Sequence, residues 1–228
     1  MRSETLVVAP HPDDETIACG GTILDRLKQG RVVRVVLLTD GRNSHSICFG
    51  IHQDPDPEQV ATLRAAEFQQ ALALLGVATG NIHCLGFCDA ALESSIAPAT
   101  AALAALLKPC QTRITEVFFP ASFDAHPDHQ AAHRIVDHAL NQLGIYPERL
   151  CYAVWPDAEH SQAPADREID ISAHLETKAR ALSLYVSQVQ RITPEQPEAV
   201  LPAAMLAAIR KSPVERFWNA SVSDESKN

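Results

Sequence analysis

Positive charge is scarce in this sequence. Its 228 residues include 19 lysines and arginines against 28 aspartates and glutamates, which gives a formal net charge of −9. A surface of that sign repels polyanions, so nucleic acid and anionic membranes are not expected partners. The ten histidines add little positive charge, because most imidazoles are neutral at pH 7.

Long apolar runs are missing as well. The opening MRSETLVVAP has no apolar signal-peptide core, and no run approaches the roughly 20 residues that span a bilayer. The six cysteines are scattered without a CxxC pair, which suits buried thiols in a reducing compartment better than a disulfide framework. We therefore expect a cytoplasmic protein without an integral membrane segment.

The sequence does contain a regular alternation of short apolar runs with segments of helical period. This rhythm predicts an α/β fold, a Rossmann-like, doubly wound, mostly parallel sheet flanked by helices. We expect an α/β domain over residues 1–189, an extension at 190–218 packed on the same domain, and a disordered tail at 219–228. The expected strands lie at residues 5–10, 32–39, 81–87, 115–120 and 149–155.

Two strand ends carry an unusual density of metal-binding residue types. The stretch VVAPHPDDE, residues 7–15, places one imidazole and three carboxylates within five residues. Adjacent like charges repel, so a bound cation is the simplest reason to collect them. A second cluster, HPDH at 126–129, opens a predicted helix in which His129 shares the buried side with Val136 and Leu140.

Both clusters follow strands, and ligands bind doubly wound sheets beyond the carboxyl ends of their strands. Mixed nitrogen and oxygen donors suit zinc with an open position better than calcium or magnesium. Asp40 and Asp89 end two other predicted strands at the same edge, which makes them candidates for hydrogen bonds to sugar hydroxyls. Asp40 has an alternative role, since an aspartate can stabilise the turn into Gly41.

The motifs APHPDDETIACGG and HPDHQAAHRIV together resemble the PIG-L/LmbE-like family of zinc-dependent N-deacetylases. The similarity covers residues 1 to about 190. Thr39-Asp40-Gly41 resembles the family's TxG turn, Arg64-x-x-Glu67 its RxxE helix, and Lys178-x-x-Ala181 its KxxA helix. The resemblance implies an LmbE-like catalytic domain that removes the acetyl group of an N-acetylated amino sugar or glycoconjugate. It also makes a homo-oligomer plausible.

Carried over position by position, the resemblance implies one zinc ion per chain, bound by His11, Asp14 and His129. Asp13, between two ligand positions, would be the general base. Physical chemistry supports that role, because zinc-bound water has a pKa of roughly 7 and a neighbouring carboxylate can take its proton.

The resemblance implies that His126 is a cation that stabilises the developing oxyanion, and that Asp128 orients His126. A protonated imidazole beside the attacked carbonyl suits this task. We interpret His133, one turn further along the helix, as a core histidine. Glu15 is interpreted as a first-turn acid that favours the helix dipole.

Two charges, Arg64 and Glu67, fall inside the apolar arc of their predicted helix. Buried charges need a partner. One interpretation is an internal ion pair between them; the other, implied by the resemblance, is that Arg64 binds a substrate hydroxyl while Glu67 holds Arg64. The role of Lys178 stays open, because lysine can extend its amine from an inner helix face to solvent.

Other kinds of protein fit parts of the pattern. A dinucleotide-binding domain would need GxGxxG where HPDDE stands. A non-haem Fe(II) oxygenase would use His11, Asp13 and His129 as its triad, although the β/α rhythm differs from the barrels that usually carry one. A non-catalytic zinc module would need a fourth protein ligand. An amidase of the same family with another amide substrate is a further alternative.

Overall fold

The computed structural model describes residues 2–156 and 163–220. Within these residues seven strands form one sheet in the order β3-β2-β1-β4-β5-β7-β6. The strands are β1 (Glu4–Ala9), β2 (Val32–Thr39), β3 (Ile82–Phe87), β4 (Ile114–Pro120), β5 (Glu148–Tyr152), β6 (Arg167–Asp170) and β7 (Val214–Asn219).

The first five strands run parallel to one another, and β1 and β4 lie at the centre. This is the doubly wound order, in which the chain starts in the middle and winds outward in both directions. The predicted fold class is confirmed, and each of the five expected strands forms close to its expected position.

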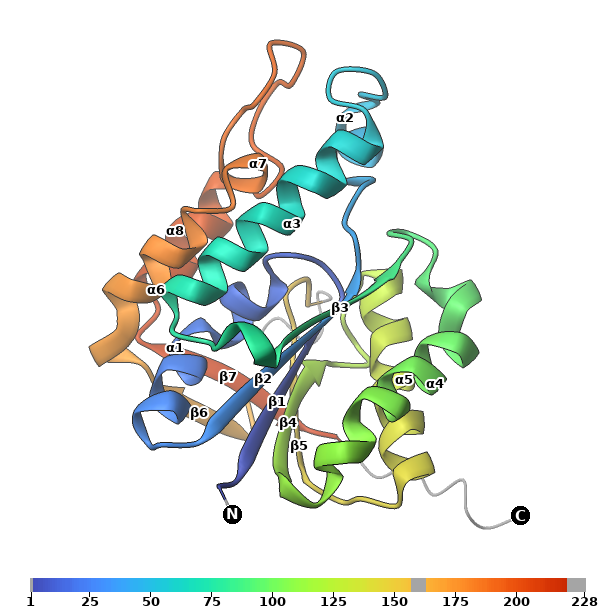
Figure 1. The fold of residues 1–228 in the computed structure, drawn as a ribbon. Coiled ribbons are helices and arrows are strands. Elements are labelled where there is room, and N and C mark those ends of the chain that lie inside the picture. The colour runs from blue at the N-terminus through green and yellow to red at the C-terminus, as the bar shows by residue number, and fades with distance from the viewer. Residues whose placement is uncertain (1, 157–162, 221–228) are drawn as a thin grey trace.

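Helices cover both faces of the sheet (Figure 1). Helices α4 and α5 lie on one face, while α1, α3, α6 and α8 lie on the other (Figure 1). The helices are α1 (Asp14–Lys28), α2 (Ser44–Phe49), α3 (Pro57–Leu74), α4 (Ile96–Leu107), α5 (Pro127–Leu143), α6 (Leu175–Leu182), α7 (Val186–Val189) and α8 (Ala203–Lys211). Short 3-10 turns are η1 (Thr79–Asn81), η2 (Leu92–Ser95), η3 (Lys108–Arg113) and η5 (Ser172–His174).

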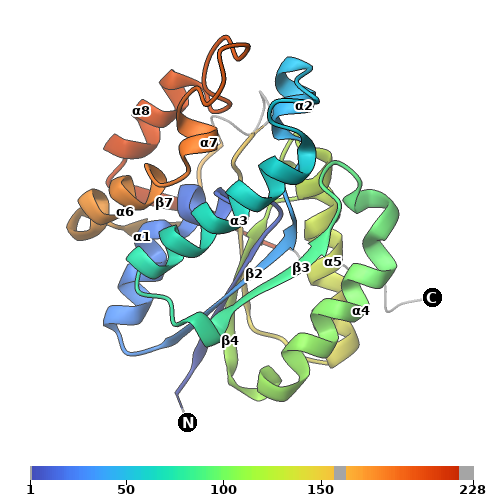
Figure 2. The ribbon, with the colours of Figure 1, turned by 45° about the horizontal axis from the view of Figure 1, so that its top comes forward.

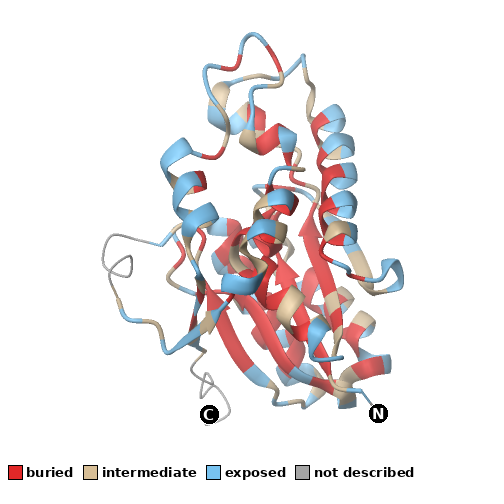
Figure 3. Cartoon of the chain, turned by 90° about the vertical axis from the view of Figure 1, so that its left-hand side faces the viewer, coloured by how far each residue is buried: buried red, intermediate tan, exposed pale blue. Residues whose placement is uncertain are grey.

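Strand β1 shows how the sheet divides the core. Successive side chains of a strand point to opposite faces, so Leu6 and Val8 pack with the α4 and α5 layer while Val7 and Ala9 pack with the α1 layer. All four are fully buried. Figure 3 shows the same pattern over the sheet, whose strands are largely buried while the helices expose their outer sides.

The C-terminal segment joins the sheet, which the sequence did not indicate. Strand β7 runs antiparallel to β5 and also pairs with β6. The Phe217 ring packs on the Phe118 ring of β4 with 4.8 Å between centroids. The predicted tail began at 219, but Asn219 ends β7, and residues 221–228 of that tail lie outside the described residues.

The long connection at residues 41–57, which showed no periodicity, contains the short helix α2. Figure 2 shows α2 and the segment after α7 next to each other beyond the sheet. Neither described range holds a helix long and apolar enough to cross a membrane.

Candidate active site

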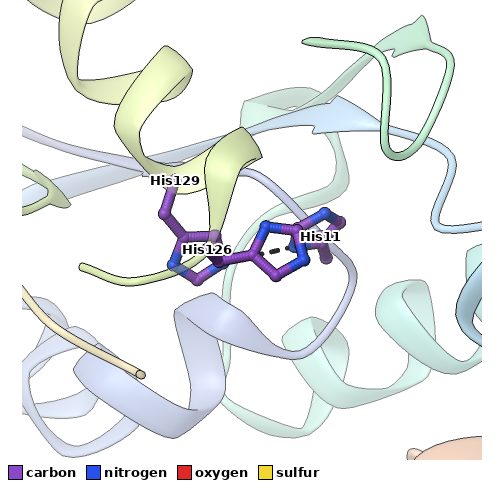
Figure 4. A group of neighbouring side chains, drawn as sticks. All are labelled: His11, His126 and His129. Atoms are coloured by element: carbon purple, nitrogen blue, oxygen red, sulfur yellow. Dashed lines mark hydrogen bonds between the residues drawn. The ribbon is translucent and has the colours of Figure 1, made fainter. Parts of the chain in front are cut away.

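His11, Asp14 and His129 converge beyond the carboxyl ends of β1 and β4. Nδ1 of His11 lies 3.2 Å from Oδ2 of Asp14, Nε2 of His129 lies 3.1 Å from the same oxygen, and the two nitrogens are 3.3 Å apart. Figure 4 shows the imidazoles of His11 and His129 facing each other, with His126 beside them. Tetrahedral zinc with bonds of about 2.1 Å spaces its ligand atoms about 3.4 Å apart. The three donor atoms therefore fit a single zinc-sized ion.

Local structure explains how each donor reaches this point. The buried strand β1 ends at Ala9, and helix α1 begins at Asp14. The Asp14 carboxylate turns back and accepts a hydrogen bond from the His11 amide at 2.9 Å. Pro127 opens α5, where a missing amide hydrogen costs nothing. His129 therefore stands in the first helical turn, and its side chain is fully buried.

Carboxylates also hold the far nitrogens of both histidines. Nε2 of His11 lies 3.2 Å from Oδ1 of Asp89 and 3.3 Å from Oδ2 of Asp128. Nδ1 of His129 lies 3.1 Å from Oδ2 of Asp124. Such pairs fix the tautomer and the ring orientation of a metal-binding histidine. Burial lowers the pKa of His129, but Asp14 and Asp124 outweigh it and raise the pKa to about 9.

Asp128 is placed differently from its predicted position. Its carboxylate was expected to orient His126, yet it contacts His11 and accepts hydrogen bonds from the amides of Ala90 and Leu92 at 2.8 and 3.1 Å. Only the Asp128 backbone meets His126, donating its N–H to Nδ1 at 3.2 Å. The helix-opening geometry turns the Asp128 side chain toward the β3 end instead.

His126 lines the pocket beside the other two imidazoles. Its ring centroid lies 4.7 Å from that of His11 and 5.0 Å from that of His129. Nδ1 accepts an amide hydrogen bond, and burial together with positive charge on His11 and His129 lowers the His126 pKa. Because Nδ1 accepts the Asp128 amide, the hydrogen of a neutral His126 ring stands on Nε2.

Asp13 sits in a strained backbone conformation, with φ of 128° and ψ of −30°. Such a conformation costs a non-glycine residue of order 1–3 kcal/mol and persists only when its surroundings hold it. Its Oδ1 lies 3.3 Å from Nη2 of Arg64. Burial raises the pKa of Asp13 to about 8, despite the opposing charge of Arg64. A buried carboxyl of this kind lies directly beside Asp14, one of the three donors.

Arg64 reaches the same loop from α3. Nη2 donates to the carbonyl of Pro12 at 2.6 Å and Nη1 to that of Gly41 at 3.0 Å. Gly41 has φ of 65°, and a Cβ there would lie 2.7 Å from Nη1, so only glycine fits. Arg64 and Glu67 form no ion pair, and Glu67 does not hold the Arg64 side chain by a hydrogen bond. Glu67 instead accepts the amide and the hydroxyl of Ser187.

The profile of one protein family, described as "PIG-L: GlcNAc-PI de-N-acetylase", matches residues 6–140. This chain belongs to the PIG-L family. A "Probable N-acetyl-alpha-D-glucosaminyl L-malate deacetylase 2" of Bacillus cereus is 27% identical to it over 221 residues, 96% of this chain and 98% of the relative. A "1D-myo-inositol 2-acetamido-2-deoxy-alpha-D-glucopyranoside deacetylase" of Mycobacterium sp. (strain KMS) is 26% identical over 81% of this chain and 73% of the relative.

Solved structures agree with the fold of this PIG-L protein. The "conserved protein TT1542" of Thermus thermophilus superposes with a TM-score of 0.71 and 26% identity, over 95% of this chain and 94% of the other. The family match ends within α5, so it covers both motifs of the donor cluster but neither the end of the chain nor β7.

Other residues singled out in the sequence lie outside the cluster of this PIG-L protein. Asp40 pairs with Arg42 at 2.7 Å and accepts the Arg42 amide at 3.2 Å, which matches the turn interpretation. His133 is half-buried, and its Nδ1 lies 2.9 Å from the carbonyl oxygen of Pro120. Glu15 is fully buried, unlike a surface acid that only serves a helix dipole.

Asp124 is the residue that sequence reasoning missed. It stands two positions before His126 in the same loop, and it is fully buried. Besides His129, its carboxylate accepts the amides of Val154 and Trp155 at 2.8 and 3.1 Å. A second acid beside Asp128 in the loop that carries HPDH was the available signal.

One pocket connects the donor cluster of the PIG-L protein to solvent. Asp89, expected at this edge, does line it, whereas Asp40 does not. We call the polar side of this pocket, which holds the donor residues, its inner wall, and the apolar side its outer wall. The inner wall is formed by His11, Asp13, Asp14, Arg64, Asp89 and His126, and the outer wall mainly by Ile17, Ile47, Val154, Trp155, Val200 and Leu201.

Proposed function

We propose that this PIG-L protein is a zinc-dependent deacetylase, with one zinc ion per chain, that hydrolyses the N-acetyl group of an amino sugar or glycoconjugate. The deacetylase assignment agrees with its family and with the names of its relatives. The observation that carries the proposal is the cluster of His11 Nδ1, Asp14 Oδ2 and His129 Nε2, with the carboxylate of Asp13 beside it.

His11, Asp14 and His129 would hold the ion, because two imidazoles and one carboxylate form a common donor set of hydrolytic zinc sites. When bound, zinc supplies a Lewis acid that polarises the amide carbonyl and lowers the pKa of water. Asp89, Asp124 and Asp128 keep the two histidines in the orientation that this requires.

Asp13 is proposed as the proton carrier. A carboxylate at the pocket wall can accept a proton from the attacking water and return it to the nitrogen of the leaving amine. Burial raises the pKa of Asp13 from its ordinary value, which favours its holding the proton between the two halves of that transfer. Arg64 holds the carboxylate in place through the contact at 3.3 Å.

His126 is proposed to stabilise the oxyanion as a neutral donor. Attack on the amide makes its carbon tetrahedral and its oxygen negative, and an N–H aimed at that oxygen lowers the barrier. Because Nδ1 of His126 is occupied by the Asp128 amide, Nε2 carries the hydrogen that faces the reaction. Acetate and a free amine are the products.

The oxygenase alternative required Asp13 to complete a triad with His11 and His129. Oδ2 of Asp14 lies 3.2 Å from His11 and 3.1 Å from His129, while the Asp13 carboxylate contacts Arg64, and these contacts support the hydrolase proposal. That arrangement favours hydrolysis, in which a separate carboxylate carries the proton. The amidase alternative uses the same residues and differs only in its substrate.

The decisive experiment combines metal analysis with a release assay. Purified protein should contain about one zinc per chain and release free amine from N-acetylated amino sugars, and a chelator should abolish the release until zinc is restored. Asp13→Ala should keep the zinc and lose turnover, whereas His129→Ala should lose both. Zinc loss in Asp13→Ala, or bound iron with oxygen-dependent turnover, would contradict the assignment.

A further inference from the structure

The outer wall of the active-site pocket is built from apolar residues of several chain segments. Ile47 comes from α2, Trp155 follows β5, and Val200 and Leu201 lie between α7 and α8. These segments are far apart in sequence, yet Gln188 of α7 and Ser44 of α2 line the same pocket. Figure 1 shows α2 and the segment after α7 rising together beyond the sheet.

Ile47, on the six-residue helix α2, is 65% exposed. Contact with water is unfavourable for its apolar side chain. Its neighbours across the pocket, Trp155 and Val200, are only half buried. Partly exposed apolar side chains gathered beside a polar site are typical of a surface that a ligand covers. Leu201, which lines the same wall, is buried. Because these side chains line the same pocket as the donor cluster, the ligand that covers them is in reach of the reaction centre.

Cationic side chains are scarce along the same wall. Among the described residues that line the pocket, Arg64 is the single lysine or arginine. Its two terminal nitrogens already contact Asp13, Pro12 and Gly41. Asp13, Asp14 and Asp89 add negative charge nearby. Among the described residues, a carboxylate or phosphate on the substrate would therefore find no free cation to pair with at the outer wall.

We propose that the substrate carries an uncharged, apolar group attached to its N-acetylated amino sugar, and that Ile47, Trp155, Val200 and Leu201 bind this group. The inference rests on the deacetylase function proposed above. The sugar and its acetamido group occupy the polar inner wall, and the apolar aglycone extends over the outer wall. This chain then differs in specificity from its relative named for an L-malate conjugate, whose aglycone is anionic.

The test measures kcat/KM for methyl, butyl and phenyl glycosides of N-acetylglucosamine, as both anomers, and for the malate glycoside. Each buried methylene stabilises a complex by about 0.8 kcal/mol, so three would raise kcat/KM by up to about 60-fold if they were fully buried. On a partly open wall we expect the butyl and phenyl glycosides to exceed the methyl glycoside by at least about tenfold. The malate glycoside should not exceed it.

Ile47→Ser and Val200→Ser should each reduce the ratio of kcat/KM for phenyl over methyl glycoside at least about threefold. Ile47 is largely exposed, so its replacement does not endanger folding. Leu63→Ser on α3 is the matched control, because Leu63 is an exposed apolar residue that does not line this pocket, and it should leave the ratio unchanged.

Three results would overturn the inference, and they are distinguishable. Hydrolysis of all glycosides at equal rates, or best of the malate glycoside, would leave the deacetylase standing and refute the apolar aglycone. Absence of amine from every glycoside, with zinc bound, would refute the proposed function itself. A ratio that Ile47→Ser does not change, together with a loss of oligomers in sedimentation, would show that Ile47 packs against a second copy of the chain.

Discussion

Lys178 and Glu215 form a buried ion pair that ties strand β7 to helix α6. Nζ of Lys178 lies 2.7 Å from Oε1 of Glu215, and both residues are 4% exposed. The same carboxylate accepts hydrogen bonds from the amides of Gly21 and Thr22 in α1, at 2.8 and 2.7 Å. Lys178 therefore has a structural partner, and Glu215 secures the helix that begins with Asp14.

Removing either partner leaves a buried charge uncompensated. We expect Glu215→Ala and Lys178→Ala each to lower the free energy of unfolding by about 3–5 kcal/mol, measured by urea titration. The exposed pair of Arg216 and Glu168, 3.0 Å apart in the neighbouring strands, provides the control. Glu168→Ala should cost less than about 1 kcal/mol. Equal losses in both pairs would contradict the role assigned to burial.

Asp124 should control metal affinity through His129 without binding the ion itself. We expect Asp124→Asn to weaken zinc binding by about 10- to 100-fold, because the imidazole loses the carboxylate that orients it. Competition with a chromogenic chelator measures this. Asp40→Asn is the control, because Asp40 pairs with Arg42 and does not line the pocket. The zinc affinity of this variant should equal that of the unchanged protein.

The strain at Asp13 can be measured separately from its chemistry. Asp13→Ala and Asp13→Gly should both lose about 100- to 10,000-fold in turnover, because neither side chain can carry a proton. Glycine adopts φ of 128° without penalty, so the glycine variant should be more stable than the alanine variant by about 1 kcal/mol. A glycine variant that is less stable, as in an ordinary helix, would show that this backbone is not strained.

His133 should make the protein sensitive to acid. Burial lowers its pKa below the ordinary 6.5, so the unfolded chain binds the proton more readily than the folded one. Its contribution to stability is therefore present above pH 6.5 and is lost as the pH falls, by at most about 1.4 kcal/mol per pH unit. His133→Leu should reduce the slope of the unfolding free energy between pH 7 and pH 5. An unchanged slope would mean that His133 has the same pKa in the folded and unfolded chains.

The central fold and the donor cluster were predictable because their signals are local. Strands such as 32–39 are apolar at most positions, and HPDDE and HPDH each bring imidazole and carboxylate groups within a few residues of a strand end. The orientation of a side chain in a loop carries no such signal. Asp40 and Asp89 both follow strands, yet Asp40 turns to Arg42 while Asp89 accepts the amide of Asn43 and reaches His11.

Contacts between distant segments explain the remaining differences. Glu215 meets α1 across more than 190 residues, and nothing in the six-residue strand β7 indicates that partner. Asp128 was expected at His126, its neighbour in sequence, but its carboxylate contacts amides near β3 instead. Such pairings are determined by which strand ends the folded sheet brings together, and they become visible only in three dimensions.

The place of β7 in the sheet has a consequence for biosynthesis. Among the described residues β7 is the last strand, but it lies between β5 and β6, and β6 pairs with no other strand there. On the ribosome, β6 thus has no place in the sheet until residues 214–219 have been made. The hydrogen bonds from α1 to Glu215 likewise form only after β7 has been synthesised. The final packing around the donor cluster is therefore completed only after synthesis of the strand farthest from it in sequence.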